Sequence, residues 1–308
     1  CCTPSRTAVK YSFVRVYGEK PIVYFSKNLT PNELIKLYKK LNVRLEGRVA
    51  VKLHSGEPGN QNFLGPDFFG PIIKEVNGTI VESNTAYDGL RNTTKKHLET
   101  IQKHGWMNKF QFDLLDAEGP DLVLDIPNGK VIKKNYVGKD LVYYDSMLVL
   151  SHFKGHPMGG YGGALKQLSI GIASSYGKAY IHGCGKPEDI WTSNHDQFLE
   201  SMADAAESIV RYFNGQIVYI NVMKNMSVDC DCCAVAEDPC IKDIGVLIST
   251  DPIAIDQACL DLVYASVDPG KSHFIERVES RNGVHTIEAA FALGYGQREY
   301  ELKDITNE

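Results

Sequence analysis

The alternation of short apolar runs with longer amphipathic runs restricts the fold of this 308-residue chain more than any other feature. Strand-length apolar runs are separated by stretches in which apolar residues recur every three or four positions, as in helices. This order predicts an α/β fold with a mainly parallel central sheet flanked by helices. The predicted strands are residues 22–25, 49–53, 79–82, 122–126, 146–150, 217–222 and 245–249, and the predicted helices are residues 31–41, 66–76, 93–104, 195–213, 253–264 and 284–293.

The sequence predicts one large domain with a small departure from the main sheet. Residues 127–145 alternate polar and apolar side chains around Asn128-Gly129, a hairpin signal, and predict a small antiparallel excursion. We expect residues 21–308 to form a single α/β domain, preceded by a leader or tether at 1–20. A weak seam is expected near 214–216, where Asn214-Gly215 ends a long helix. That helix, 195–213, is expected to pack on one face of the sheet.

Composition excludes several classes of protein. The 33 basic and 38 acidic residues give a formal net charge of −5, which opposes binding to nucleic acid. A hydrophobic content of 43% excludes a disordered chain, and no apolar run reaches the roughly 20 residues of a membrane-spanning helix. The first residue is a cysteine. Two locations therefore stay open: a bacterial envelope lipoprotein anchored at Cys1, or the cytoplasm.

Polar loops follow four of the predicted strands, directly after Leu53, Glu82, Leu150 and Val222. Open α/β sheets bind their ligands beyond the carboxyl ends of the strands, so we expect these loops to form one composite site. Two candidate site residues in them are His54 and Arg91, and Arg91 suits bidentate binding of a substrate carboxylate. The alternative is that both are ordinary polar loop residues.

A glycine-rich segment, residues 151–166, follows a predicted strand and leads into a helix that begins near Ala164. Glycines such as Gly160, Gly162 and Gly163 allow close backbone approach, and a helix N-terminus offers free N–H groups to an anion. The segment matches neither a P-loop nor a dinucleotide fingerprint. We expect it to bind a small, anionic molecule. The alternative is a flexible turn without a ligand.

The same segment resembles the active site of the lactate racemase family, in the spacing His156-x3-Gly160-Tyr161-Gly162-Gly163-x2-Lys166, then Gly171-Ile172-Ala173, then His182. The resemblance implies a nickel-pincer-like nucleotide tethered to Lys166, metal ligation by His182 and an acid/base role for His156. A second acid/base histidine of that family lies in a Gly-x-His-Arg segment. Here Gly89-Leu90-Arg91 has leucine, so His54 or His97 would have to substitute.

Over most of its length the chain resembles domain-of-unknown-function family 362, whose members are described as uncharacterised iron–sulfur-centre proteins. The segments that carry the resemblance are residues 51–57, 84–87, 155–160, 229–232 and 249–256. Some members add a ferredoxin module with Cys-x2-Cys-x2-Cys spacing, and this chain has no such spacing.

Cysteines concentrate in one short stretch that contains Cys230, Cys232, Cys233 and Cys240. Thiolates bind soft or borderline metals, so these four residues are candidate ligands of a single metal ion or an iron–sulfur cluster. The Cys-x-Cys spacing is tighter than the usual Cys-x2-Cys chelate. A disulfide and free buried thiols are the alternatives.

Three functions fit these features. The first is a small-molecule enzyme, racemase-like or an oxidoreductase, with a metal or tethered cofactor at His156, Lys166 and His182. The second is an iron–sulfur or metal-binding redox protein centred on residues 230–240, and the third is a non-catalytic envelope binding protein. For the first, we expect residues 164–173 to form a helix leading away from the loop and residues 179–183 to bring His182 back to it.

Overall fold

The computed structural model describes residues 19–119 and 121–308. The expected leader, residues 1–20, lies outside these ranges except for its last two residues, and Cys1 lies outside them.

One large sheet forms the centre of the molecule, with strand order β12-β1-β11-β10-β7-β2-β3-β4. β10, β7, β2, β3 and β4 pair in parallel, as do β1 and β12, whereas β11 runs antiparallel to both of its neighbours. The strands of this sheet are β1 (Ile22–Ser26), β2 (Val49–Lys52), β3 (Thr79–Glu82), β4 (Phe112–Leu114), β7 (Ser146–His152), β10 (Ile217–Met223), β11 (Gly245–Ser249) and β12 (Glu301–Asp304).

Two small antiparallel pairs stand apart from the main sheet. β5 (Leu122–Asp125) pairs with β6 (Lys134–Val137), and β8 (Lys154–His156) pairs with β9 (Gly160–Gly162). The first pair is the excursion expected around Asn128-Gly129, and the second is built from the glycine-rich segment.

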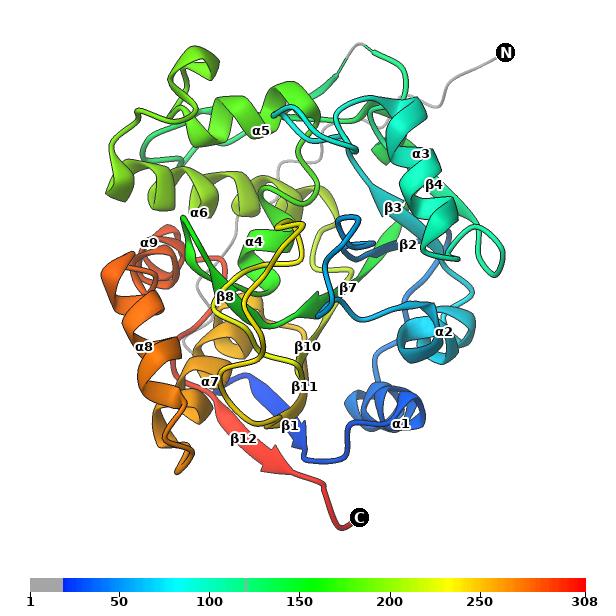
Figure 1. Cartoon of the computed structure of the whole chain (residues 1–308), viewed down its shortest axis with the longest axis vertical. Coiled ribbons are helices and arrows are strands. Elements are labelled where there is room, and N and C mark those ends of the chain that lie inside the picture. Colours follow the sequence, from blue (N-terminus) through cyan, green and yellow to red (C-terminus); the bar gives the residue numbers. More distant parts are fainter. Residues whose placement is uncertain (1–18, 120) are drawn as a thin grey trace.

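Helices cover both faces of the main sheet (Figure 1). Among the residues that the structure describes, no helix is long and apolar enough to cross a bilayer. The helices are α1 (Pro31–Leu41), α2 (Pro66–Glu75), α3 (Thr94–Lys103), α4 (Ala164–Leu168), α5 (Ser175–His182), α6 (His195–Tyr212), α7 (Pro252–Ala265), α8 (Lys271–Ser280) and α9 (His285–Leu293), with short 3-10 turns η1 (Lys139–Tyr143) and η2 (Pro187–Asp189).

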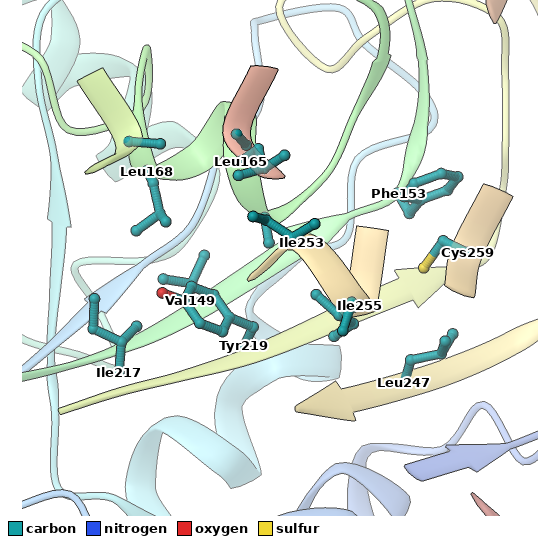
Figure 2. Close-up of a cluster of buried hydrophobic side chains, with 14 of the residues drawn as sticks. Val149, Phe153, Leu165, Leu168, Ile217, Tyr219, Leu247, Ile253, Ile255 and Cys259 are labelled. Atoms are coloured by element: carbon teal, nitrogen blue, oxygen red, sulfur yellow. The ribbon is translucent and has the colours of Figure 1, made fainter. Parts of the chain in front are cut away.

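Each face of the sheet has its own apolar core. α1, α2 and α3 cover one face, where Leu34, Phe69 and Ile101 are buried. α4 and α7 contact β7, β10 and β11 on the other face, with α6, α8 and α9 outside them (Figure 1). Figure 2 shows Leu165 and Leu168 of α4 beside Val149 and Tyr219 of the sheet. The short helix α4 is therefore held to the sheet by its apolar side chains.

The N-terminus of α4 is capped by a carboxylate from another helix. Asp256 of α7 is fully buried and accepts hydrogen bonds from the backbone N–H of Ala164 (2.7 Å) and of Leu165 (3.0 Å). Asn221 and Tyr161 also donate to this carboxylate, at 2.7 and 3.2 Å. Orphan N–H groups at a helix start need such acceptors. Asp256 therefore fixes the start of the helix that carries Lys166.

The predicted α/β class with a mainly parallel sheet is confirmed, and each predicted strand and helix is present with small shifts at its ends. Two expectations differ from the structure. Helix α6 packs chiefly on α9, α4 and α5 and also contacts β5 and β6, so α4 and α9 separate much of it from the main sheet. The run 164–173 is helical only to Leu168, because Ser174 caps a second helix, α5, by accepting from Gly177 N–H.

We expect Asp256→Ala to lower the free energy of unfolding by roughly 3–5 kcal/mol, since two buried N–H groups and the Asn221 amide lose their acceptor. Urea denaturation followed by circular dichroism measures the change. The matched control is Asp261→Ala on the exposed side of the same helix, which should cost under about 1 kcal/mol. Equal effects of the two changes would contradict the capping role.

Candidate functional site

A cavity of about 560 Å³ lies at the carboxyl ends of the parallel strands. Its wall combines residues at or just beyond the ends of four strands. They are Lys52 and His54 at the end of β2, the loop from Ser83 after β3, the segment from His152 at the end of β7, and the cysteine loop after β10. These strands run in the same direction, so their carboxyl ends meet at one edge of the sheet. Its size suits a small molecule or cofactor.

Most of the candidate residues line this one cavity. They are His54, Arg91, His156, Gly162, Gly163, Lys166, His182, Cys230, Cys232 and Cys233. Three candidates lie elsewhere. Gly160 is packed on Gly283, the Cys240 thiol contacts the carbonyl of Met226 at 3.5 Å, and His97 is buried between Glu82 and Asn84. Cys240 is therefore not a candidate ligand for a metal in the cavity, and His97 does not face it.

The glycine-rich segment forms the β8–β9 hairpin because its backbone touches other backbone. A side chain at Gly155 would meet the main chain of Val228 in the cysteine loop. Gly160 has a φ of 77°, a left-handed conformation that favours glycine. These contacts bring the hairpin against the cysteine loop and deliver His156 and Lys166 to the cavity.

Lys166 is the third residue of α4 and lies half-buried in the cavity wall. Desolvation lowers its pKa to about 7, and the positive charges of Lys154 and Lys52 act in the same direction. Among the described residues, no carboxylate pairs with its amine. A substantial fraction of this amine is therefore neutral near pH 7, as a nucleophilic lysine requires.

His182 ends helix α5 and stacks on Phe198, with the ring centroids 4.6 Å apart. Its Nδ1 is buried and has no hydrogen-bond partner among the residues that the structure describes. Burial, together with the charges of Lys166 and Lys178, lowers the pKa of His182 to about 3. The ring is therefore neutral, which is the form that ligates a metal.

His156 and His54 have the same tautomer. Nδ1 of His156 accepts from the backbone N–H of Met158 (3.1 Å) and Gly159 (2.9 Å), and Nδ1 of His54 accepts from Gly56 N–H (3.0 Å). Burial holds the pKa of both rings well below the ordinary value. Each neutral ring therefore carries its proton on Nε2, where it can donate to an oxygen of a bound ligand.

The cysteine loop, residues 229–240, contains one disulfide, between Cys230 and Cys232. Cys233 and Cys240 are free thiols. One ring nitrogen of His156 and the sulfur atoms of Cys230 and Cys232 lie within 4.8 Å of one another. Of the alternatives left open by the sequence, the structure therefore has the disulfide, placed beside a histidine in the cavity.

Asp231, between these two cysteines, anchors the loop through its carboxylate. Its carboxylate accepts from Nδ1 of His152 (2.9 Å) and from the amine of Lys154 (2.6 Å). Burial opposes ionisation here, yet the neighbouring His152 and Lys154 hold the pKa of Asp231 below its ordinary value. The ion pairs join the cysteine loop to β7 and β8.

Positive charge exceeds negative charge in the cavity wall. Arg91 pairs with Glu57 at 2.6 Å, and Lys154 pairs with Asp231. Lys52 and Lys178 instead donate to backbone carbonyls. Desolvation lowers the pKa of Lys52 to about 7 and that of Lys178 to about 8. Together with Lys166, they give the cavity an excess of cations that suits an anionic ligand.

Two aromatic side chains stand at the rim of the cavity. Trp191 is 64% exposed and Tyr87 is 37% exposed, and their ring centroids are 6.2 Å apart. Trp191 also lies 6.4 Å from the ring of His182. Trp191 and Tyr87 therefore form a partly exposed section of the cavity wall.

Several lining residues were not predicted. Lys52 and His152 stand at the ends of strands and Lys154 lies in the glycine-rich segment, so their positions carried a signal. Asp231 could have been found from its place between two cysteines. No sequence signal marks Lys178 as a site residue, since it lies within α5 like an ordinary helical lysine.

The chain belongs to the family defined by the domain of unknown function DUF362, whose family model matches residues 49–261. Among curated proteins, no sequence matches the chain.

Two solved structures are similar in fold. The lactate racemase apoprotein from Thermoanaerobacterium thermosaccharolyticum is 16% identical with a TM-score of 0.39, and the similarity covers 66% of this chain and 51% of that one. A Thermotoga maritima protein is 11% identical with a TM-score of 0.43, covering 85% and 58%. The chain spans about half the length of the racemase apoprotein.

We expect binding of sulfate, which stays fully ionised, to weaken by about tenfold or more between pH 6 and pH 8.5. Lys52 and Lys166 have pKa values of about 7, so both lose charge over this range and attract an anion less strongly. Calorimetric titration at constant ionic strength measures the affinity. Lys166→Met should flatten the pH dependence, whereas Lys103→Met on exposed helix α3 should not. An affinity that is constant with pH would contradict the charge assignment.

Proposed function

We propose that this protein is a small-molecule enzyme, racemase-like, that binds a carboxylate-bearing substrate in the cationic cavity and uses Lys166 as the covalent attachment point of a cofactor. The observation that carries the proposal is the state of Lys166: an amine without a carboxylate partner, with a pKa of about 7, facing the same cavity as His182. The resemblance of residues 156–182 to the lactate racemase segment adds to it.

The residues of the cavity fit a tethered nucleotide with a bound metal. Lys166 would hold the organic part through its amine, and the Nδ1 of His182, buried without a partner, marks a ring without a competing hydrogen bond. Such a group, when bound, supplies a centre that removes and returns hydrogen at a substrate carbon. A neutral His182 is the protonation state that ligation needs.

The other side chains would bind and orient the substrate. Lys52 and Lys178 offer positive charge to its carboxylate. The guanidinium of Arg91 is held by Glu57 at 2.6 Å, which fixes its direction in the wall. His54, with its proton on Nε2, can donate a hydrogen bond to a substrate oxygen. In this proposal, His54 would serve as the second acid/base histidine that the racemase resemblance implies.

We expect glyoxylate with cyanoborohydride at pH 7 to label Lys166 at least tenfold faster than the exposed Lys103. The neutral amine attacks the aldehyde of glyoxylate, and water leaves to give an imine. Hydride from cyanoborohydride then reduces this imine to a stable amine. The lowered pKa supplies more neutral amine than a surface lysine has, and the neighbouring cations attract the carboxylate of the reagent. Peptide mass spectrometry locates the adducts.

Lys166→Met should remove the selective adduct, and Lys103→Met should leave it unchanged. Neutral propanal should lose most of the preference for Lys166, because it lacks the charge that the cavity attracts. Labelling spread evenly over surface lysines would defeat the proposal. Intact mass and metal analysis of protein purified from its native host then separate a tethered cofactor, seen as a mass on Lys166, from an unmodified nucleophile.

A further inference from the structure

We propose that Cys230, Cys232 and His156 form a binding site for a thiophilic divalent metal ion, and that the site becomes available only when the Cys230–Cys232 disulfide is reduced. The inference goes beyond the proposed function and does not depend on Lys166. It also gives His156 a role as a metal ligand in place of the acid/base role implied by the racemase resemblance.

The three ligand atoms are already close enough for one ion. One nitrogen of His156 and both sulfur atoms lie within 4.8 Å of one another. The Cα atoms of the two cysteines are 5.2 Å apart. Metal–sulfur bonds of about 2.3 Å at a tetrahedral angle would put the sulfurs about 3.8 Å apart. Rotation of the two side chains reaches this distance without movement of the backbone.

The surrounding contacts hold the cysteine loop whether or not the disulfide is present. Asp231 is tied to His152 and Lys154, and the side-chain amide of Asn60 donates to the carbonyls of Cys230 (3.3 Å) and Cys233 (2.8 Å). None of these bonds involves a sulfur atom. Because the backbone is fixed in this way, the two thiols stay side by side after reduction and bind an ion at little cost in conformational entropy.

A backbone N–H group and two basic side chains lie near the two sulfur atoms. The backbone N–H of Cys232 donates to the sulfur of Cys230 at 3.3 Å, and Lys154 and Lys166 line the same cavity. A thiolate is stabilised by N–H donors and nearby cations. In the reduction, a dithiol gives two electrons and two protons to the disulfide and is itself oxidised to a disulfide. Metal binding then releases the protons of both thiols.

His156 supplies the third ligand after a change of tautomer. Its Nδ1 accepts two backbone N–H groups here, so the ring proton lies on Nε2. A neutral ring binds a metal at Nε2 when the proton moves to Nδ1, and the two N–H groups of Met158 and Gly159 then have to turn away from the ring. Two sulfurs and one nitrogen leave the fourth position of a tetrahedral ion to the cavity, as in metal sites that bind a substrate or water.

The neighbouring cysteines provide matched controls. Cys233 and Cys240 are free thiols of the same loop, and neither belongs to the group of atoms within 4.8 Å. The thiol of Cys240 contacts Met226 O instead. A serine at position 240 therefore changes a thiol of this loop without touching the proposed site.

The test is a Co²⁺ titration of the full chain in its oxidised form and after reduction with a phosphine that is then removed. We expect the reduced protein to bind one Co²⁺ with a sulfur-to-cobalt charge-transfer band, and the oxidised protein to show no such band. Cys230→Ser and Cys232→Ser should each lose most of the band. His156→Ala should weaken binding by at least about tenfold, and Cys240→Ser should match the reduced wild type.

Comparison of the oxidised and reduced wild type keeps the test independent of the folding of any variant, and circular dichroism verifies each serine variant. A reduced wild type without a charge-transfer band overturns the proposal. A charge-transfer band that persists in each of the two single variants, Cys230→Ser and Cys232→Ser, also overturns the proposal, because the ligands would then be other cysteines. Glyoxylate labelling of Lys166 involves no thiol, so failure of one proposal leaves the other standing.

Discussion

The parallel pairing of β10, β7, β2 and β3 is the constraint on which the site depends. Strands that run in one direction must be joined by crossovers, and the loops that leave them all begin at the same edge. Four segments far apart in sequence therefore meet there. The antiparallel β11 follows the cysteine loop and returns the chain to the sheet, so this loop stays at the edge where the other three begin.

Charge in the cavity shows the tension between stability and function. Lys52, Lys166 and Lys178 are placed in surroundings that favour their neutral forms. Desolvation lowers their pKa values, and nearby carboxylates such as Glu82 and Asp116 offset this effect only in part. A core built for stability alone would avoid such groups. Other buried polar groups nearby, such as Asp256 and Asp231, have their hydrogen-bond partners. The three lysines, in contrast, line the cavity, where a bound ligand would cover them.

Much of the fold could be predicted because apolar periodicity and helix caps are local signals; Thr30-Pro31, for example, starts α1 as expected. The loops of the site could be predicted from the ends of the strands. Details that rest on distant partners could not. The cap of α4 by Asp256 depends on a side chain 92 positions away in sequence. The disulfide between Cys230 and Cys232 could not be separated from metal binding by spacing alone. Lys178 joins the wall only because α5 packs there.

The chain has two tryptophans, and their surroundings could hardly differ more. Trp106 is fully buried and donates to the carbonyl of Ser55, whereas Trp191 stands at the cavity rim, 64% exposed. Indole emission depends on contact with water. Its blue component therefore comes from Trp106 and its red component from Trp191. The unlabelled molecule thus carries its own optical reporter of occupancy, and collections of small acids can be screened against it by the shift in its fluorescence alone.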